Sequence, residues 1–492
     1  MTKRLQVRRG SYVDSVTLMQ VSRRIGALDG VDAALVAMAT DLNLDLATSM
    51  GFELPDRTAP NEMLVAVDAV DDAALASAFD DVDAALSQAA SPAATSFGSA
   101  PPPVTIRAAA RAGDASVALV STPGQYAFAD AVDAVDAGLH TMVFSDNVPV
   151  EHEVALKQYA DPAGVLVMGP DCGTAVIGGV GLGFSNVVRP GPVGIVAASG
   201  TGAQHLMTLL DHAGVGVSHC LGVGGRDLSE AVGGISTRRA LDLLAGDEGT
   251  EVVVVVSKPP AESVAEQVRK HAETLGKPVL FALLGQGRPT LTRAAEQAVA
   301  AVGGTWRSPE HRDGAVREGR SGGYLRGLFA GGTLCDEAMV LATDRLGPIT
   351  SNTPLPGGHA IGDDLGSAGH TLVDFGDDRL TQGRPHPMID GAIRVDRLSA
   401  EVDDPTTGVV LMDVVLGLGA AADPAAELAD GVVRATAAGI PVVASVIGTR
   451  DDPQGVDRQV ETLHRAGAWV YLSNADAALA ALDLLDAPEA TA

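Results

Sequence analysis

Short runs of apolar residues alternate with helical stretches over most of the chain, and this alternation limits the folds that it can adopt. Between residues 115 and 305 the apolar runs are SVALVST, HTMVFSD, VLVMGPDC, VGIVAAS, EVVVVVS and KPVLFALLG. Strands that are apolar on both faces and are linked by helices are typical of parallel sheets covered on both sides. The pattern returns in HTLVDFG, TGVVLMDVV and IPVVASVIG. We therefore predict an α/β protein with doubly wound parallel sheets.

The N-terminal part has a different order of elements. Expected strands are RLQVRR, AALVAMA and NEMLVAVDAV, and the expected helices are DSVTLMQVSRRIGAL, NLDLATSMGF and DDAALASAFDDVDAALSQ. This order predicts a small α+β module of ferredoxin-like type. The stretch AASPAATSFGSAPPPV that follows has the composition of a linker.

A length of 492 residues predicts roughly three domains of about 150 residues each. The predicted units are a ferredoxin-like module at 1–90, a linker at 91–105, a Rossmann-like domain at 106–190, a flavodoxin-like domain at 191–305, a second linker at 306–325 and a C-terminal domain at 326–492.

Composition excludes several classes of partner. A net charge of -28 disfavours nucleic acid, because no basic surface is left to neutralise phosphates along a strand. Three widely spaced cysteines indicate neither a disulfide framework nor a zinc site, and the histidines form no ligand pattern. No apolar run approaches the roughly 20 residues that span a membrane. We expect a cytoplasmic protein without a bound metal or cofactor.

The segment GIVAASGTGAQHLM leads from a strand through a small-residue turn into a helix. Ser199, Gly200 and Thr201 lie at the start of that helix, where free N–H groups and the helix dipole favour an anion. Serine and threonine are also ordinary N-caps, so simple capping is the alternative. The segment has neither a P-loop lysine nor the spacing of a dinucleotide fingerprint.

Other candidate residues lie in loops that follow apolar strands, where open parallel sheets bind their ligands. In GRPHPMID, Arg384 suits a carboxylate or phosphate and His386 suits proton transfer near neutral pH. The remaining candidates for substrate binding are Gln125, Asn147, Asp171, Gly332 and Thr333. The structural alternatives are ordinary polar loop ends for Gln125 and Asn147, and helix capping for Gly332 and Thr333. Cys172 is expected to be a buried small residue, not a nucleophile.

The chain resembles a known family in a series of ordered motifs. Residues 115 to 305 are similar to the α subunit of succinyl-CoA synthetase, on the segments GPDCGTA, SGTG and GVGG, in that order. Residues 370 to 490 look like the C-terminal domain of its β subunit. Over its whole length the chain resembles the FdrA-type family, with SYVDSVTLM, AGGTLCDEA and GRPHPMID as further signatures.

The resemblance implies a phosphate site between the N-termini of two facing helices. One helix start corresponds to Ser199, Gly200 and Thr201. The other is expected at Gly417 and Gly419, before the helix in DPAAELADG. The resemblance is incomplete: no histidine occurs between His271 and His311 to carry a phosphoryl group, and no Gly-rich CoA turn precedes SVALVST. The chain also has no segment left for a nucleotide-binding ATP-grasp domain.

By this resemblance, the chain is expected to be a subunit of a carbamoyltransferase that interconverts oxalurate plus phosphate with oxamate plus carbamoyl phosphate. Its expected partners are small anions (phosphate, carbamoyl phosphate and a carboxylate) and additional protein subunits in an oligomer. Two alternatives stay open: an acyl-CoA synthetase subunit that a partner chain completes, and a non-catalytic ligand-binding scaffold.

Overall fold

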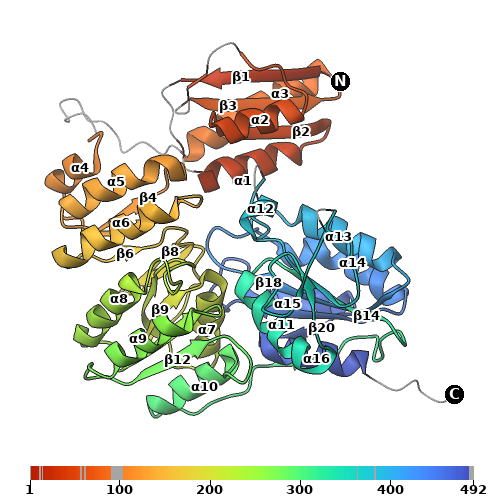
Figure 1. Cartoon of the computed structure of the whole chain (residues 1–492). Coiled ribbons are helices and arrows are strands. Elements are labelled where there is room, and N and C mark those ends of the chain that lie inside the picture. Colours follow the sequence, from red (N-terminus) through yellow and green to blue (C-terminus); the bar gives the residue numbers. More distant parts are fainter. Residues whose placement is uncertain are drawn as a thin grey trace.

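The computed structural model describes residues 2–9, 13, 15–55, 58–59, 62–89, 103–362, 364–381 and 384–486. These residues form an N-terminal module, a small three-stranded unit beside it, a larger unit below that, and a C-terminal unit across from both (Figure 1). The fold is mixed α/β, with mainly parallel sheets after the N-terminal module, as predicted.

The N-terminal module has an antiparallel sheet of order β1-β3-β2, made of β1 (Thr2–Arg8), β2 (Val31–Met38) and β3 (Met63–Ala69). Its helices are α1 (Ser15–Gly26), α2 (Asp41–Ser49) and α3 (Asp72–Ala89). The residues of β3 are buried throughout because α1 and α3 cover one face while Ala47 and Phe52 cover the other. The signature SYVDSVTLM lies partly outside the described residues.

A three-stranded parallel sheet follows, built from β4 (Val117–Val120), β5 (His140–Val143) and β6 (Val167–Met168). Its helices are α4 (Ile106–Ala112), α5 (Gly124–Asp136) and α6 (Val150–Ala160), with a 3-10 turn at Asp161–Ala163. This unit ends earlier than the predicted boundary at residue 190. The reason is that β7 (Thr174–Ile177) and β8 (Val180–Gly183) form a hairpin that pairs with the next sheet.

The second unit has a six-stranded sheet of order β12-β11-β9-β10-β7-β8. Its parallel strands are β9 (Pro190–Ala198), β10 (Val217–Gly222), β11 (Val252–Ser257) and β12 (Val279–Leu283), which have the winding of a flavodoxin-like sheet. The helices are α7 (Gly200–His212), α8 (Ile235–Gly246), α9 (Glu262–Ala272) and α10 (Leu291–Ala301). Apolar strands such as VVVVVS are buried on both faces, as their composition predicts.

The C-terminal unit has an eight-stranded sheet of order β13-β20-β19-β18-β14-β17-β15-β16. Its strands are β13 (His311–Arg312), β14 (Tyr324–Phe329), β15 (Thr350–Ser351), β16 (His359–Ala360), β17 (Thr371–Asp374), β18 (Thr407–Val415), β19 (Val442–Ile447) and β20 (Trp469–Tyr471). Its helices are α11 (Gly332–Leu346), α12 (Asp378–Thr381), α13 (Ala392–Asp403), α14 (Pro424–Ala437), α15 (Val456–Arg465) and α16 (Asn474–Leu485). The predicted linker at 306–325 contributes β13 to this sheet.

The second and C-terminal units share one apolar core. Helix α7 packs against α10 of its own unit and against α11 of the C-terminal unit. The residues from Gly202 to Asp211 are therefore all buried, although a helix on the surface of a domain has one exposed face. This shared core fixes the start of α7 opposite the C-terminal unit.

Candidate functional site

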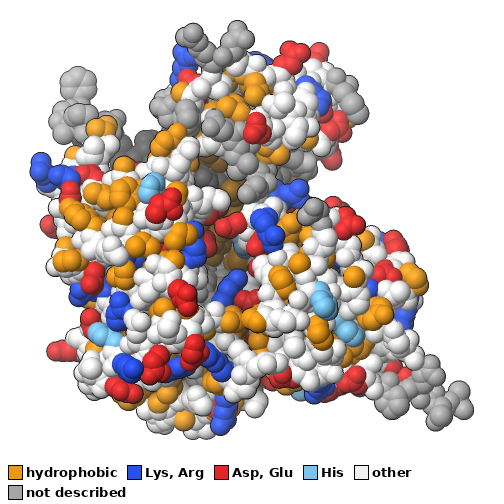
Figure 2. Space-filling view, in the orientation of Figure 1, with side chains coloured by type: hydrophobic (Ala, Val, Ile, Leu, Met, Phe, Trp, Pro, Cys, Tyr) orange, Lys and Arg blue, Asp and Glu red, His pale blue; other side chains and the backbone are white. Residues whose placement is uncertain are grey.

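A cavity of about 490 Å³ lies where the four parts of the chain meet. A volume of that size is typical of sites for small ligands. The space-filling view shows the hollow between the N-terminal module, the three-stranded unit and the C-terminal unit (Figure 2). The cavity is lined by residues as far apart in the sequence as Met19 of α1 and Ile389, and by the loops after β4, β5, β6, β9, β10, β11, β14 and β17.

The start of α7 forms one side of this cavity. Ser199 is the N-cap, and its hydroxyl accepts a hydrogen bond from the Gly202 amide at 2.9 Å. The first amides of a helix have no intrahelical acceptor, and here they come after a buried parallel strand. Ser199, Gly200 and Thr201 all line the cavity. The structure therefore combines capping by Ser199 with an open helix end.

The helix start that faces α7 is that of α11. The Ser199 and Thr333 hydroxyl oxygens lie 2.6 Å apart, and a Cβ added to Gly331 would lie 2.9 Å from the Thr201 hydroxyl. Gly332 and Thr333 line the cavity beside Gly200. Two helix N-termini thus converge on one space, and each favours negative charge there.

The predicted second helix start, at Gly417 and Gly419, does not line the cavity and does not face the start of α7. A Cβ on Gly417 would lie 2.6 Å from the carbonyl oxygen of Ser185, and Gly417 N donates to Gln454 Oε1 at 3.1 Å. Gly419 packs against the ring of Phe184. The glycines allow close packing between two units, so the loop does not form an open anion site. The predicted pairing of α7 with the Gly417–Gly419 loop is corrected to α7 with α11.

A buried carboxylate fixes the start of α11. Asp413, near the C-terminal end of β18, accepts hydrogen bonds from the amides of Ala330 at 2.8 Å and Gly331 at 2.7 Å. Its charge is paired with Arg394 at 3.0 Å. A buried carboxylate needs such partners. Asp413 therefore holds the loop after β14 in place and is not free for a ligand.

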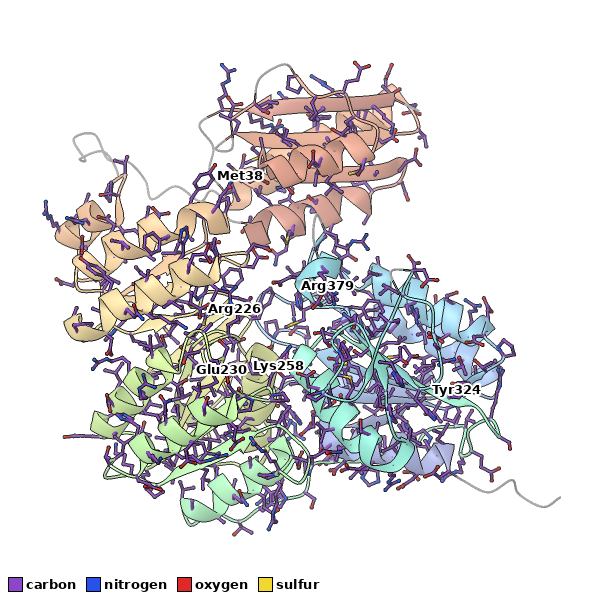
Figure 3. The ribbon with its side chains drawn as sticks, in the orientation of Figure 1. Met38, Arg226, Glu230, Lys258, Tyr324 and Arg379 are labelled. Carbon is purple, nitrogen blue, oxygen red and sulfur yellow. The ribbon has the colours of Figure 1, made fainter. Side chains whose placement is uncertain are left out.

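Lys258, which sequence reasoning missed, lies between the two helix starts. Its Nζ is 3.8 Å from Asp336 Oδ2 and 4.0 Å from Asp374 Oδ2. A Cβ on Gly332 would lie 2.6 Å from Lys258 Nζ, so the ammonium group stands at the first residue of α11. Figure 3 shows Lys258 and Arg226 on the side of the second unit and Arg379 across the gap on the C-terminal unit. The sequence does hold a signal for Lys258: it is one of five lysines in the chain, and it directly follows the apolar strand EVVVVVS, where parallel sheets bind ligands.

Asp171 projects into the cavity from the turn after β6. Its amide donates to the Ser145 carbonyl at 2.9 Å, while its carboxylate has no hydrogen bond or ion pair with any described residue. Gly224 packs against this turn, since a Cβ there would lie 2.5 Å from the Pro170 carbonyl oxygen. Burial, and then the charges of Asp378 and Asp146, raise the pKa of Asp171 to about 7.

Arg226, also missed from the sequence, is held on a buried ionic network. Its Nε donates to Glu153 Oε2 at 3.0 Å and its Nη2 to the Val148 carbonyl at 2.8 Å. Lys157 Nζ donates to Glu153 Oε1, the Val223 carbonyl and Asp227 Oδ1, at 2.7, 2.9 and 2.8 Å. The network joins α6 to the loop after β10, and Arg226, which lines the cavity, keeps N–H groups that these bonds do not use.

His386 lines the cavity, but it does not titrate near neutral pH as predicted. Burial, and then the charge of Arg394, lower its pKa to about 4. His386 Nδ1 accepts from the Met388 amide at 3.2 Å, so the neutral ring carries its proton on Nε2. The imidazole is thus a hydrogen-bond donor at pH 7. Arg384 also lines the cavity, is exposed, and has no carboxylate partner among the described residues.

Gln125 and Asn147 do not line the cavity, although their neighbours Pro123 and Asp146 do. Gln125 lies exposed in the first turn of α5. Asn147 has a φ of 53°, in the left-handed region, and its carbonyl is close to Gly124. This backbone turn places Asn147 outside the lining. All three cysteines are buried, and burial raises the pKa of Cys172 to about 12, as expected for a residue that is not a nucleophile.

Comparison with known proteins places the chain in a family. It is 35% identical to the protein YahF of Escherichia coli K12 over 517 aligned positions, which cover 99% of both chains. The chain belongs to the YahF family. The function of that E. coli protein is uncharacterized, so the relationship gives the architecture and no activity.

Two family models match parts of the chain. Residues 1–102 match a domain described as the heavy metal-associated domain of AllF, and residues 328–484 match the CoA-ligase domain. This combination is consistent with the FdrA-type resemblance. Residues 1–102 contain no cysteine and no histidine, so this segment offers no thiolate or imidazole ligand to a soft metal.

More distant relatives share the scaffold of the α subunit of succinyl-CoA synthetase. The chain is 26% identical to the succinate–CoA ligase α subunit of Methanothermobacter thermautotrophicus over 203 residues, or 41% of this chain and 68% of that one. Against an Archaeoglobus fulgidus succinate–CoA ligase α subunit the identity is 28% over 41% of this chain and 69% of that one.

Among solved structures, the dinucleotide-forming acetyl-coenzyme A synthetase 1 of Ca. Korarchaeum cryptofilum is 16% identical, with 80% of this chain and 87% of that one covered and a TM-score of 0.31. That score is too low to place individual residues. Among the helices of the described residues, none is long and apolar enough to cross a membrane.

Proposed function

We propose that this chain is the subunit of a carbamoyltransferase that binds phosphate or carbamoyl phosphate between α7 and α11. The observation that carries the proposal is the convergence of the two helix starts, with Ser199 and Thr333 in contact and Lys258 beside them. Free amides, hydroxyl groups and one ammonium group are the donors that a phosphate group takes. Ser199, Gly200, Thr201, Gly332 and Thr333 are its proposed ligands.

The opposite wall of the cavity supports a substrate with N–H groups and a carboxylate. Asp146, Asp171 and Asp378 line it, and they accept hydrogen bonds from amide nitrogen when ionised. Arg226 can bind a carboxylate through its N–H groups. Oxalurate carries a carboxylate at one end and a ureido group at the other, so it presents both kinds of group.

The proposed reaction balances without an added reagent. A phosphate oxygen attacks the terminal carbonyl carbon of oxalurate, a C–O bond forms, the C–N bond to the oxamate nitrogen breaks, and that nitrogen takes up the proton that phosphate loses. A tetrahedral oxyanion forms between these steps and needs fixed hydrogen-bond donors. The Nε2–H of His386 and the guanidinium of Arg384 are the proposed donors. Positioning of two bound substrates supplies much of the rate in such a transfer.

A CoA-dependent reaction has less support from the residues present. CoA binding in the α subunits that the chain resembles is expected to need a Gly-rich turn before β4. In the described residues 103–116 the chain instead enters the sheet through α4 and the turn after it. The incomplete set of catalytic groups also leads us to propose that further subunits complete the enzyme.

Thermal unfolding of the purified chain with separate titrations of phosphate, carbamoyl phosphate and CoA tests this proposal. A ligand at about 100 times its Kd adds roughly 2.7 kcal/mol to the stability of the folded state. Stabilisation by the two phosphates supports the proposal, and stabilisation by CoA alone contradicts it.

A Thr201→Val variant tests the placement of the phosphate. The change removes a hydroxyl while nearly keeping the volume, and it should weaken phosphate binding by about 1 kcal/mol or more. Val187→Thr, an exposed position away from the cavity, is the control. Unchanged affinity in the Thr201 variant would show that this hydroxyl is not a ligand.

A further inference from the structure

Asp374 stands directly in front of the proposed phosphate site. A Cβ on Gly332 would lie 2.4 Å from Asp374 Oδ2, so the carboxylate oxygen is next to the first residue of α11. The side chain lines the cavity while the residue is only 3% exposed. A buried anion at this position opposes the field that the two helix starts provide.

The backbone around Asp374 is fixed, so the residue cannot withdraw. Its amide donates to Asn352 Oδ1 at 2.9 Å, and its carbonyl accepts from Asn352 Nδ2 at 2.8 Å. Oδ1 accepts from the Gly376 amide at 2.9 Å. Oδ2 has no hydrogen bond among the described residues, and its nearest cation is Lys258 at 4.0 Å. One oxygen of a fixed carboxyl group therefore faces the cavity with a single, distant counter-charge.

We propose that Asp374 is the proton-binding group of the anion site. When an anion occupies the space between α7 and α11, Lys258 turns toward it, and the Asp374 carboxyl group takes up a proton and donates its O–H to an anion oxygen. This inference rests on the proposed function, because it needs an anion at that site. It gives the site a preference for anions that can accept such a hydrogen bond.

The groups that face Asp374 agree with this role. They come from the loop after β11, from α11, from its own loop and from the loop before α13: Lys258, Cys335, Asp336, Asp377 and His386. Lys258 is the cation among them, because His386 is neutral and the thiol of Cys335 has a raised pKa. If Lys258 turns to a bound anion, Asp374 and Asp336 lose their shared counter-charge. Asp336 does not line the cavity, so Asp374 is the group that meets the anion.

Burial already raises the pKa of Asp374 to about 7, with the nearby Asp336 adding to the effect of burial and Lys258 opposing it. At pH 8 the group is therefore about nine-tenths ionised before the anion binds. Anion binding that protonates it should then take up about one proton, and less at lower pH. The affinity should fall by nearly tenfold for each pH unit above pH 7.

Calorimetry with sulfate and phosphate at pH 8, in buffers that differ in ionisation enthalpy, measures this proton uptake. Sulfate stays fully ionised across the neutral range, so a proton that the buffer gives up when sulfate binds is bound by the protein and not by the anion. The test variant is Asp374→Asn. The matched control is Asp171→Asn, because Asp171 also has a pKa of about 7 and lines the opposite wall.

The expected result is uptake of about one proton with sulfate in the unmodified chain and in Asp171→Asn, and an uptake near zero in Asp374→Asn. Uptake that survives in Asp374→Asn, or is lost in Asp171→Asn instead, overturns the inference. Binding of both anions without proton uptake overturns it while leaving the proposed function intact, whereas absence of binding by both anions overturns the two together. If Asp374→Asn does not fold, the pH dependence of sulfate affinity in the unmodified chain decides: an affinity that does not change between pH 7 and 9 is contrary to the inference.

Discussion

Replacement of Lys157 by methionine should loosen the joint between the three-stranded unit and the second unit. Lys157 and Glu153 lie on α6, while Asp227 and Arg226 belong to the loop after β10. The side chains of Lys157, Glu153 and Asp227 are fully buried. The two cations balance the two carboxylates, so the substitution leaves one uncompensated negative charge inside the protein.

The structure sets the size of this effect. Lys157 satisfies all its N–H groups, and methionine replaces none of these hydrogen bonds. Removing one partner from a buried ionic network costs about 3–5 kcal/mol, because the remaining charge stays buried. A second change, Glu153→Gln in the same chain, restores neutrality and should recover a large part of the loss. Lys277→Met is the control, since Lys277 is partly exposed and its hydrogen bonds go to two backbone carbonyl oxygens.

Hydrogen exchange resolved by peptide is the appropriate assay, because it measures the protection of α6 and of the loop after β10 separately from that of the other units. A loss of about 3 kcal/mol corresponds to exchange faster by about 100-fold in peptides from α6 and from the loop after β10. Peptides from the C-terminal unit should be unchanged. The reasoning would be refuted by a Lys157→Met chain that exchanges like the control, or by a double variant less protected than the single one.

Three further changes test the site. Gly332→Ala should weaken phosphate binding by about tenfold, because its Cβ meets Asp374 and Lys258, whereas Gly225→Ala, with nothing within 4 Å of its Cβ, should bind normally in the same calorimetric titration. Native chain treated with iodoacetamide at pH 8 should remain unmodified by mass spectrometry, because the cysteines are buried and their thiols have raised pKa values; a carbamidomethyl adduct at Cys172 would count against this. The pKa of His386 in the folded protein is about 4, below its usual value of about 6.5, so folding becomes less favourable as the pH falls from 6.5 to 4. His386→Gln should therefore lose less stability over this pH interval, as measured by urea titrations. An equal loss of stability in both proteins would contradict the assigned pKa.

The sequence was sufficient to predict the class of fold and the helix start, at Ser199, that lines one side of the cavity. Buried strands such as VVVVVS signal a parallel sheet through composition alone, and the end of β9 signals a helix start at Ser199. Periodicity could not predict that the hairpin β7–β8 joins the second sheet, because pairing of distant strands depends on tertiary packing. The predicted boundary at residue 190 differs from the structure for this reason.

The sequence could not predict which helix start faces that of α7, because this also depends on tertiary packing. Gly332 and Gly419 both belong to Gly-rich turns that lead toward helices, so local pattern treats them alike. The two turns differ in the structure because Asp413 accepts hydrogen bonds from the turn before Gly332 and so holds that turn open. Lys258 and Asp374 are brought together by the packing of two units against each other. No sequence motif near either residue indicates that the two are neighbours.

Helix α1 also contacts residues that lie far along the chain. Arg23 contacts the Ile389 carbonyl and the Glu427 carboxylate, which follow it by 366 and 404 residues. Ribosomes add about 5–20 residues per second, and N-terminal units generally fold first. The N-terminal module has its own core, and the ribosome needs about 20–80 s after Arg23 to add Glu427, whose carboxylate Arg23 contacts. Over that interval α1 packs only within its own module, so the wall of the cavity that includes Met19 is complete only after the C-terminal unit is largely made.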